Sequence, residues 1–279
     1  MGVTVNGVEI EWRERGDGDA ILFIHGFPFN SAMWGHQLAG LPDGWRGIAP
    51  DLRGFGASDL GDEPVLGMDL FATDLARLLD HLEIDRVVLC GLSMGGYIAF
   101  DFWRQFGDRV RGIVLSDTRA TADSADTRRA RHHLADRVRE EGPAPVIDAL
   151  LPKLLSSSTT RKKKGVVSMV RAMMEETQPE TMARALLGMA ARADADQLLR
   201  TIDAPVLVVV GADDVITSRG QAEMLARGIR GARIALIEAA GHIPPLEQPD
   251  EFNSHLAQFL VGLPKNSLST RSAFGPLGG

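Results

Sequence analysis

The sequence predicts an α/β protein with a mostly parallel eight-stranded sheet flanked by helices and a helical cap inserted after the sixth strand. Short runs rich in valine, isoleucine and leucine recur along the 279 residues and alternate with segments of helical spacing. Strands of this kind, buried on both faces and separated by helices, are typical of parallel sheets. The alternation follows an N-terminal hairpin pattern and breaks only once, between Asp117 and about Ala204.

The strands and helices can be placed by their patterns. The segment "VTVNGVEIEWRERG" alternates apolar and polar residues about an Asn6-Gly7 turn, which predicts the first two strands as a hairpin. Apolar runs predict the other strands, at 20–26, 45–51, 85–91, 110–117, 205–211 and 232–242. Helical spacing predicts helices at 68–82 and 94–106.

The break in the alternation predicts a helical insertion. Because insertions of this size commonly cover a functional site, we interpret residues 120–185 as a cap over the C-terminal edge of the sheet. The core is then expected to comprise residues 1–119 and 186–262. Residues 263–279 are polar and glycine-rich without periodicity, and they are expected to form a disordered tail.

Composition limits the classes of function. A net charge of −7 argues against a nucleic-acid partner, and the run Arg161–Lys164 is interpreted as a solvated turn. The single cysteine, Cys90, excludes an intramolecular disulfide framework and is expected to pack as a small apolar residue. No signal peptide or membrane-spanning window is recognised, so we expect a cytoplasmic protein without a membrane partner. A homodimer is left open.

The segment "VVLCGLSMGGYIAF" makes Ser93 a candidate nucleophile. Ser93 follows a predicted strand and opens a predicted helix, and Gly91 and Gly95 allow the crowded turn that would lift its side chain above the sheet. A phosphate-binding loop fits less well, because "GLSMGG" has neither the G-x-G-x-x-G nor the Gly-Lys-Ser/Thr pattern. The plain alternative is a buried strand that turns into a helix.

A serine nucleophile needs a base, and His242 is the best-placed of seven histidines. His242 follows the last predicted strand in "AAGHIPPLEQP", and a site on a parallel sheet assembles at the C-terminal ends of its strands. His25 also follows a strand directly. The remaining histidines are expected to be surface or packing residues: His36, His81, His132, His133 and His255.

The acid that would orient this base follows another strand. "VLVVVGADDVITS" supplies Asp213 and Asp214 directly after a predicted strand, and Asp117 is a rival at a different strand end. Such a carboxylate would fix the histidine tautomer and stabilise its charged form. The alternative for Asp213 and Asp214 is a helix cap.

Two backbone N–H groups are candidates for an oxyanion hole. Gly26 allows a sharp turn at the end of a strand, so that the N–H of Phe27 could point at a developing oxyanion. The N–H of Met94 would be its partner at the start of the helix after Ser93. Donors of this type each contribute on the order of 10²–10³ in rate.

Taken together, the motifs resemble the α/β-hydrolase superfamily over about residues 3–262. The resemblance rests on "HGFP", "DLRGFGASD", "GLSMGG", "GADD" and "AGH", which occur in family order and spacing. It implies the α/β-hydrolase fold, with Ser93 as nucleophile and His242 as base. Asp214 aligns with the acid, as the fourth residue of G-x-x-D from Gly211.

The resemblance also extends to the rest of the site. It assigns the oxyanion-hole donors, and with them contact to substrate, to Phe27 and Met94, and it implies neither cofactor nor metal. Arg53 and Asp59 in "DLRGFGASD" are expected to brace a loop rather than react.

The members that the sequence resembles most are bacterial carboxylesterases, 3-oxoadipate enol-lactonases and acyl-homoserine lactonases. The expected activity is therefore hydrolysis of small esters or lactones through an acyl-enzyme. Perhydrolase or haloperoxidase activity, carbon–carbon bond hydrolysis, and a ligand-binding receptor with a vestigial triad are the alternatives.

Overall fold

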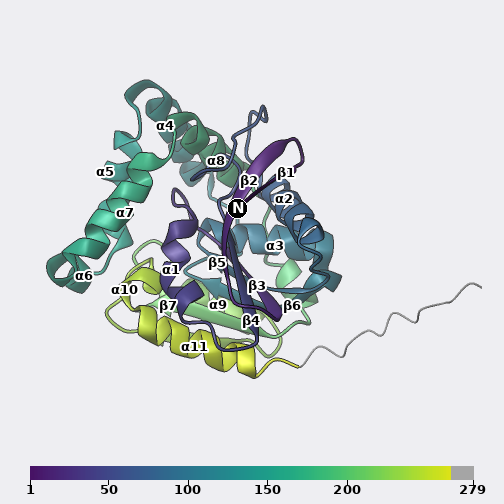
Figure 1. Ribbon diagram of the computed structural model, residues 1–279. Coiled ribbons are helices and arrows are strands. Elements are labelled where there is room, and N and C mark those ends of the chain that lie inside the picture. The colour runs from purple at the N-terminus through teal and green to yellow at the C-terminus, as the bar shows by residue number, and fades with distance from the viewer. Residues whose placement is uncertain (265–279) are drawn as a thin grey trace, which may run out of the picture.

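The computed structural model describes residues 1–264, and its sheet has the strand order β1-β2-β4-β3-β5-β6-β7-β8 (Figure 1). The strands are β1 (Gly2–Val5), β2 (Val8–Arg15), β3 (Asp19–Ile24), β4 (Trp45–Pro50), β5 (Val87–Leu92), β6 (Val110–Ser116), β7 (Val206–Gly211) and β8 (Arg233–Ile237). Strand β2 is antiparallel to β1 and β4, and the other neighbouring pairs are parallel. The predicted fold class is confirmed.

The predicted hairpin joins the first two strands. Val5 pairs with Val8, so Asn6 and Gly7 alone form the turn. Their φ angles of 45° and 77° are both positive, as a two-residue turn matching the strand twist requires. The Asn-Gly pair adopts these angles at low cost, which explains why the turn was visible in the sequence.

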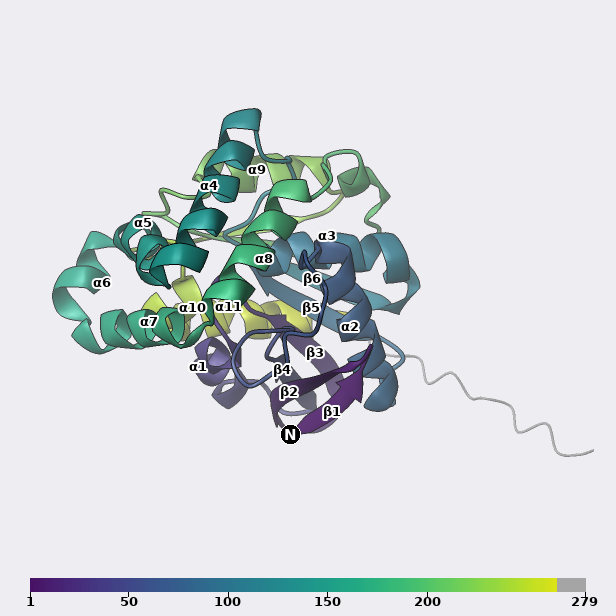
Figure 2. The ribbon, with the colours of Figure 1, turned by 90° about the horizontal axis from the view of Figure 1, so that it is seen from above.

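Helices cover both faces of the sheet. Helices α2 (Met68–His81) and α3 (Met94–Phe106) lie on one face, and α1 (Gly35–Ala39) and α11 (Pro249–Val261) lie on the other (Figures 1 and 2). Helix α9 (Arg219–Gly228) packs against β7 and β8, and α10 (Pro244–Glu247) precedes α11. Short 3₁₀ turns occupy Ser31–Trp34, Gly107–Arg109 and Leu198–Thr201.

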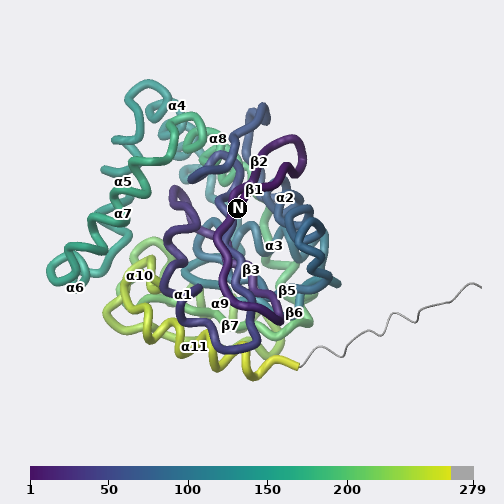
Figure 3. The backbone as a smooth tube through the Cα atoms, viewed as in Figure 1, coloured from purple at the N-terminus to yellow at the C-terminus, as the bar shows by residue number. Residues whose placement is uncertain are grey.

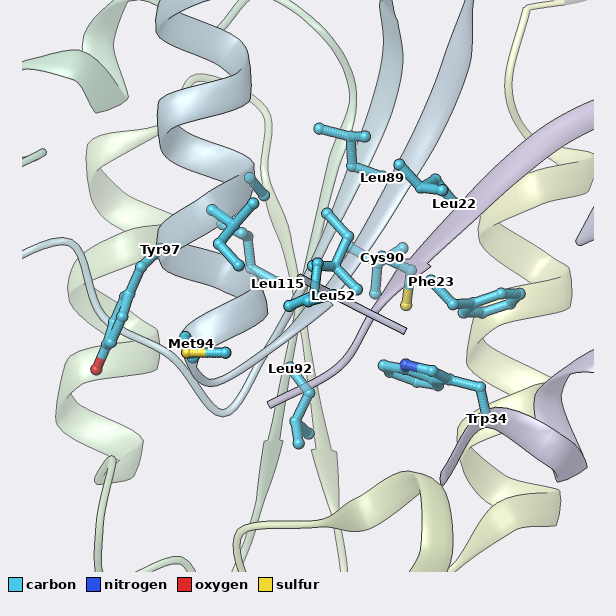
Figure 4. Close-up of a cluster of buried hydrophobic side chains, with 14 of the residues drawn as sticks. Leu22, Phe23, Trp34, Leu52, Leu89, Cys90, Leu92, Met94, Tyr97 and Leu115 are labelled. Carbon is cyan, nitrogen blue, oxygen red and sulfur yellow. The ribbon is translucent and has the colours of Figure 1, made fainter. Parts of the chain in front are cut away.

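The central strands form the apolar core. Every residue of β5 and β6 is buried, as expected for strands covered by helices on both faces. Phe23 packs against Trp34 with ring centroids 5.1 Å apart, and Cys90 lies in the same cluster (Figure 4). Burial raises the pKa of the Cys90 thiol, so this cysteine packs as an apolar residue in the core.

A helical insertion leaves the core after β6 and returns before β7 (Figure 3). Its helices are α4 (Ala125–Glu141), α5 (Ala144–Leu154), α6 (Ser157–Lys162), α7 (Lys164–Glu176) and α8 (Pro179–Ala191). Helices α4 and α8 pack side by side (Figure 2). The expected cap boundary at 185 falls inside α8, which runs unbroken through it, and the division into core and cap stays a prediction.

The two linkers of this insertion are joined by a buried carboxylate. Asp123 in the first linker accepts hydrogen bonds of 2.7 Å from Arg119, 2.6 Å from Arg131 and 2.7 Å from Arg192. Burial raises the pKa of Asp123, but the charges and hydrogen bonds of Arg131 and Arg192 outweigh burial, so this pKa is lowered overall. Because Arg192 belongs to the returning linker, this network holds both ends of the insertion together.

The packed part of the chain continues past the end of α11 at Val261. Leu263 is buried in the core, so the packed part of the chain extends into the segment that was expected to be a tail. The rest of that expected tail, residues 265–279, lies outside the described residues. Among residues 1–264, no helix combines the length and apolar character needed to cross a membrane.

Candidate active site

Ser93 lies at a strained corner between β5 and α3. Its backbone has φ 53° and ψ −110°, a region that non-glycine residues rarely adopt. Two hydrogen bonds hold this corner: the Ser93 N–H donates to the Ser116 carbonyl over 2.9 Å, and the Thr118 hydroxyl donates to the Ser93 carbonyl over 2.8 Å. Ser93 is partly exposed although its neighbours Leu92 and Met94 are buried, so its hydroxyl is accessible.

Glycines make room for this corner. A Cβ on Gly91 would lie 2.3 Å from the carbonyl oxygen of Gly95. A Cβ on Gly95 would lie 2.2 Å from the carbonyl oxygen of Ile24, at the end of β3. Real Cβ atoms do not approach backbone this closely. The glycines therefore allow the start of α3 to pack directly against the ends of β3 and β5.

The imidazole of His242 connects Ser93 to Asp214. Ser93 Oγ lies 2.9 Å from His242 Nε2, and His242 Nδ1 lies 2.9 Å from Asp214 Oδ2. Because an ionised carboxylate can only accept, Nδ1 carries the proton and Nε2 accepts from the Ser93 hydroxyl. His242 is 3% exposed, so bulk water does not compete for these hydrogen bonds.

Asp214 is held by its own loop after β7. Its Oδ1 accepts the N–H groups of Ile216 over 2.7 Å and Thr217 over 3.1 Å, and its Oδ2 accepts the Thr217 hydroxyl. Burial raises the pKa of Asp214, but the charge of His242 and these hydrogen bonds outweigh burial and lower this pKa overall. Asp213, the alternative acid, is exposed and forms no hydrogen bond with His242, whose Nδ1 is bonded to Asp214. Asp214 is therefore the ionised partner of the histidine.

Asp117 lies at the end of the neighbouring strand β6 but is bonded differently. Its Oδ1 accepts the Gly211 N–H over 2.9 Å, and its Oδ2 lies 2.7 Å from the Ser116 hydroxyl oxygen. Complete burial, and then the nearby negative charge of Asp214, raise the pKa of Asp117 well above its ordinary value. The pKa values of the two carboxyl groups are thus shifted in opposite directions, which favours an ionised Asp214 and a protonated Asp117.

This difference predicts the effect of Asp117→Asn on stability. The native state binds a proton on Asp117 that the unfolded chain has lost above pH 3.8, so this group reduces stability as pH rises from 3.8 toward its raised pKa. Asparagine has the same shape, tolerates the φ of 45° and carries no ionisable proton. We expect the variant to unfold at higher urea concentration at pH 7, with no gain below pH 3.8. An equal gain at both pH values would contradict a protonated Asp117.

These carboxyl groups and His242 could also be considered as metal ligands, since one donor atom of each lies within 4.8 Å of the others. Asp214 Oδ2, however, already accepts from His242 Nδ1 and the Thr217 hydroxyl. Protonated Asp117 is a poor ligand. The donor atoms are accounted for by their hydrogen bonds to one another and to the backbone.

The two N–H groups predicted as oxyanion donors lie near Ser93 in the fold, since Met94 follows it directly and a Cβ on Gly26, next to Phe27, would lie 3.5 Å from the Ser93 Cβ. Phe27 follows the end of β3, and Met94 is the first residue of α3, where the N–H has no partner within the helix. Within residues 1–264, neither N–H donates a hydrogen bond. The positive end of the α3 dipole also points toward this position. Both donors are therefore available to a ligand beside Ser93.

His25 braces the loop that carries Phe27. Its Nδ1 donates to the Gly26 carbonyl over 3.0 Å, and its Nε2 accepts the Leu52 N–H over 3.0 Å. Complete burial lowers the pKa of His25 to about 4, although the Gly26 carbonyl and the charge of Asp51 oppose this shift. His25 is therefore a neutral structural residue and not a second base.

The lowered pKa predicts acid sensitivity. The unfolded chain takes up a proton on His25 near pH 6.5, whereas the native state does so only near pH 4. The contribution of His25 to the free energy of unfolding is therefore complete above pH 6.5. About 3 kcal/mol of it is lost as pH falls toward 4. Urea unfolding of the native protein and of His25→Gln across this range should give a steeper loss for the native protein. Parallel pH profiles would contradict this assignment.

The loop 51–59 packs beside the site and is braced as predicted for Arg53. Arg53 makes two hydrogen bonds to Asp74, of 2.8 and 2.7 Å, and both side chains are 3% exposed. Asp59 Oδ2 accepts the Glu9 N–H over 3.3 Å, which ties the loop to β2. The inserted helices reach the same loop, because the Thr181 hydroxyl donates to the Gly54 carbonyl over 2.9 Å.

Two contacts of the site were not predicted from the sequence. The Thr217 hydroxyl contacts both Asp214 and His242 Nδ1, the latter over 3.2 Å, and the spacing D-x-x-T in "DDVIT" is the signal that could have indicated it. The Thr177 hydroxyl donates to the Pro28 carbonyl over 3.0 Å and so connects the inserted helices to the loop of Phe27. No local pattern indicates this second contact.

The site combines a hydroxyl at a strand–helix corner, a buried histidine–carboxylate pair and two free N–H groups. On a sheet of this topology, these features are those of a hydrolase of the α/β type. The chain belongs to the alpha/beta hydrolase family, whose pattern matches residues 21–255. The resemblance inferred from the motifs is confirmed.

Individual relatives agree with this family assignment. The chain is 30% identical to 3-oxoadipate enol-lactonase 2 of Acinetobacter baylyi, over 90% of this chain and 92% of that protein. Among solved structures, a thermophilic esterase from Thermogutta terrifontis has 40% identity and a TM-score of 0.90, covering 93% of this chain and 96% of its own. The enol-lactonase from Burkholderia xenovorans has 29% identity and a TM-score of 0.87, covering 94% of this chain and 100% of its own.

Proposed function

We propose that this hydrolase cleaves small carboxylic esters or lactones through Ser93, His242 and Asp214. The observation that carries the proposal is the pair of 2.9 Å hydrogen bonds that runs from Ser93 Oγ through the imidazole to Asp214. It is supported by the N–H groups of Phe27 and Met94, which no group within residues 1–264 uses. The similarity to an esterase and to enol-lactonases favours a carboxylic ester or lactone carbonyl as the target.

The first half-reaction forms an acyl-enzyme. His242 Nε2 takes the proton of the Ser93 hydroxyl while Oγ attacks the carbonyl carbon. The carbonyl oxygen becomes an oxyanion and accepts the N–H groups of Phe27 and Met94. The carbon–oxygen bond to the leaving alkoxide then breaks, and the alkoxide takes the proton from His242. Asp214 stabilises the imidazolium that exists between these two proton transfers.

The second half-reaction consumes water. His242 Nε2 takes a proton from a water molecule, whose oxygen attacks the acyl carbon and forms a second oxyanion. The bond to Ser93 Oγ then breaks, and His242 returns the proton to that oxygen. The products are a carboxylic acid and an alcohol; from a lactone both groups remain in one molecule.

A hydrolysis panel tests the proposed substrate class. We expect turnover of short p-nitrophenyl esters or γ-lactones, and labelling by a phosphonate probe that is confined to Ser93. Acyl-homoserine lactones, and esters with added hydrogen peroxide, test the narrower lactonase and perhydrolase alternatives. A native protein that neither hydrolyses these compounds nor forms the phosphonate adduct would contradict the proposal and favour a binding role.

A further inference from the structure

Glu247 is a fully buried carboxylate outside the set of residues assigned to the reaction. It ends α10, is 0% exposed, and forms no ion pair with a basic side chain among residues 1–264. A buried carboxylate is costly unless hydrogen bonds replace the water that it has lost. Backbone N–H groups of three other residues provide these hydrogen bonds, and their positions indicate what Glu247 does.

One oxygen of Glu247 holds the backbone on both sides of His242. Its Oε1 accepts the N–H of Gly241 over 2.7 Å and the N–H of Ile243 over 3.4 Å. Hydrogen bonds to a charged acceptor are roughly twice as strong as those between neutral groups. The peptide groups before and after His242 are therefore held by the same carboxylate oxygen.

The other oxygen of Glu247 holds the inserted helices. Its Oε2 accepts the N–H of Ser156, in the turn between α5 and α6, over 2.8 Å. The end of α5 also contacts the histidine loop, residues 238–243 between β8 and α10, because the His242 N–H donates to the Leu154 carbonyl over 2.8 Å. A Cβ on Gly241 would lie 2.8 Å from the Ser156 nitrogen, so the two segments touch without space for a side chain.

Further hydrogen bonds fasten the two segments. The Ser156 hydroxyl donates to the Ala239 carbonyl over 3.0 Å. Lys163, between α6 and α7, donates to the Glu247 carbonyl and, over 3.2 Å, to the side-chain oxygen of Gln248. The histidine loop and the α5–α6 turn are therefore connected at several points, and the Glu247 carboxylate accepts hydrogen bonds from both.

We propose that Glu247 is a positioning residue: its carboxylate fixes the position of the His242 imidazole by binding the backbone on both sides of it. Because the same carboxylate binds the α5–α6 turn, the position of the imidazole also depends on how that turn packs. The proposal rests on the proposed function, in which His242 is the base. Proton transfer from Ser93 depends on the 2.9 Å separation from Nε2, and a misplacement of about 1 Å can cost on the order of 10² in rate. The inserted helices thus contribute to catalysis through the backbone of the base.

The test uses substitutions at Glu247 and Ser156, which remove different hydrogen bonds of the connection between the histidine loop and the α5–α6 turn. Glu247→Ala removes both sides, and Glu247→Gln keeps the size but presents an N–H₂ group to one of the two sets of N–H donors. Ser156→Pro removes the N–H on the helical side together with the Ser156 hydroxyl, and the φ of −60° at Ser156 and the extended Leu155 before it suit proline. Ser156→Ala is the matched reference for Ser156→Pro, since it removes the same hydroxyl and keeps the N–H.

For Glu247→Ala we expect kcat for a p-nitrophenyl ester to fall by about 10², with KM close to the native value. The kcat of Ser156→Pro should be lower than that of Ser156→Ala by a similar factor. The kcat of Glu247→Gln should lie between those of the native protein and Glu247→Ala. Thermal unfolding identifies any variant that does not fold. If Glu247→Ala fails to fold, the comparison of Ser156→Pro with Ser156→Ala decides the question.

A second measurement separates this proposal from the proposed function. The ¹H NMR signal of the His242 Nδ1–H, which reports the hydrogen bond to Asp214, should shift or broaden in Glu247→Ala, and it should do so more in Ser156→Pro than in Ser156→Ala. If the native protein hydrolyses no ester but the signal still shifts, the proposed function fails and the positioning role stands. If folded variants at both positions retain the native kcat and the native signal, the positioning role is overturned.

Discussion

Replacement of Ser93 by alanine is expected to lower kcat for ester hydrolysis by about 10⁶, because the nucleophile and its base act as one unit. The Ser93 hydroxyl is bonded to His242 Nε2 and forms no cap for α3, so its loss should leave the fold unchanged. Steady-state hydrolysis of a p-nitrophenyl ester measures the effect, and the same variant should not form the phosphonate adduct.

Ser58→Ala provides the matched control for this substitution. The Ser58 hydroxyl is buried, bridges the backbone of Asp51 and Glu11, and does not contact His242. We expect this variant to lose about 1 kcal/mol of stability and to retain the native kcat. Native turnover by Ser93→Ala would exclude Ser93 as nucleophile whatever the control shows.

Replacement of Asp214 by asparagine is expected to lower kcat by about 10⁴. The variant keeps the shape of the side chain but can present N–H₂ instead of an acceptor to His242 Nδ1. The imidazole would then carry its proton on Nε2, where it cannot accept the proton of Ser93. The carboxylate charge that stabilises the imidazolium is lost as well. A pre-steady-state measurement of acyl-enzyme formation should locate the defect in that step.

Asp117→Asn is the paired control, since the two carboxyl groups end neighbouring strands. A protonated Asp117 already behaves as a neutral group, so its amide variant should hydrolyse esters at a rate close to that of the native protein. A large loss of kcat in Asp117→Asn, with little loss in Asp214→Asn, would reverse the assignment of the acid. This comparison decides between the two carboxyl groups that the sequence offered.

The elements that could be predicted from the sequence are those whose structure is determined by residues close together in the chain. The Asn6-Gly7 turn, the apolar run of β5 and the helical spacing of α3 each depend on residues within a few positions of one another. The site residues could be predicted because parallel strands end at one edge of the sheet, which brings Asp214 and His242 toward Ser93. The order of the motifs along the chain was sufficient for that inference.

The parts that could not be predicted depend on contacts between distant segments. Glu247 lies in the segment "GHIPPLEQP", and nothing in that segment shows that its carboxylate binds the N–H of Ser156, which lies 91 positions away. The protonated state of Asp117 depends on burial and on the charge of Asp214, neither of which is visible in a strand-end pattern. Likewise, the continuation of α8 through residue 185 and its packing against α4 involve segments far apart in the chain.

By itself the sequence determined the fold class, the family and the residues that meet at the sheet edge, because hydrophobic period, turn chemistry and motif order are properties of the chain. Only the tertiary structure decided which carboxyl group contacts His242, which N–H groups remain free, and how the inserted helices hold the histidine loop. Those features depend on separations of about 3 Å between segments far apart in the chain, where hydrogen bonds and charge interactions are decided.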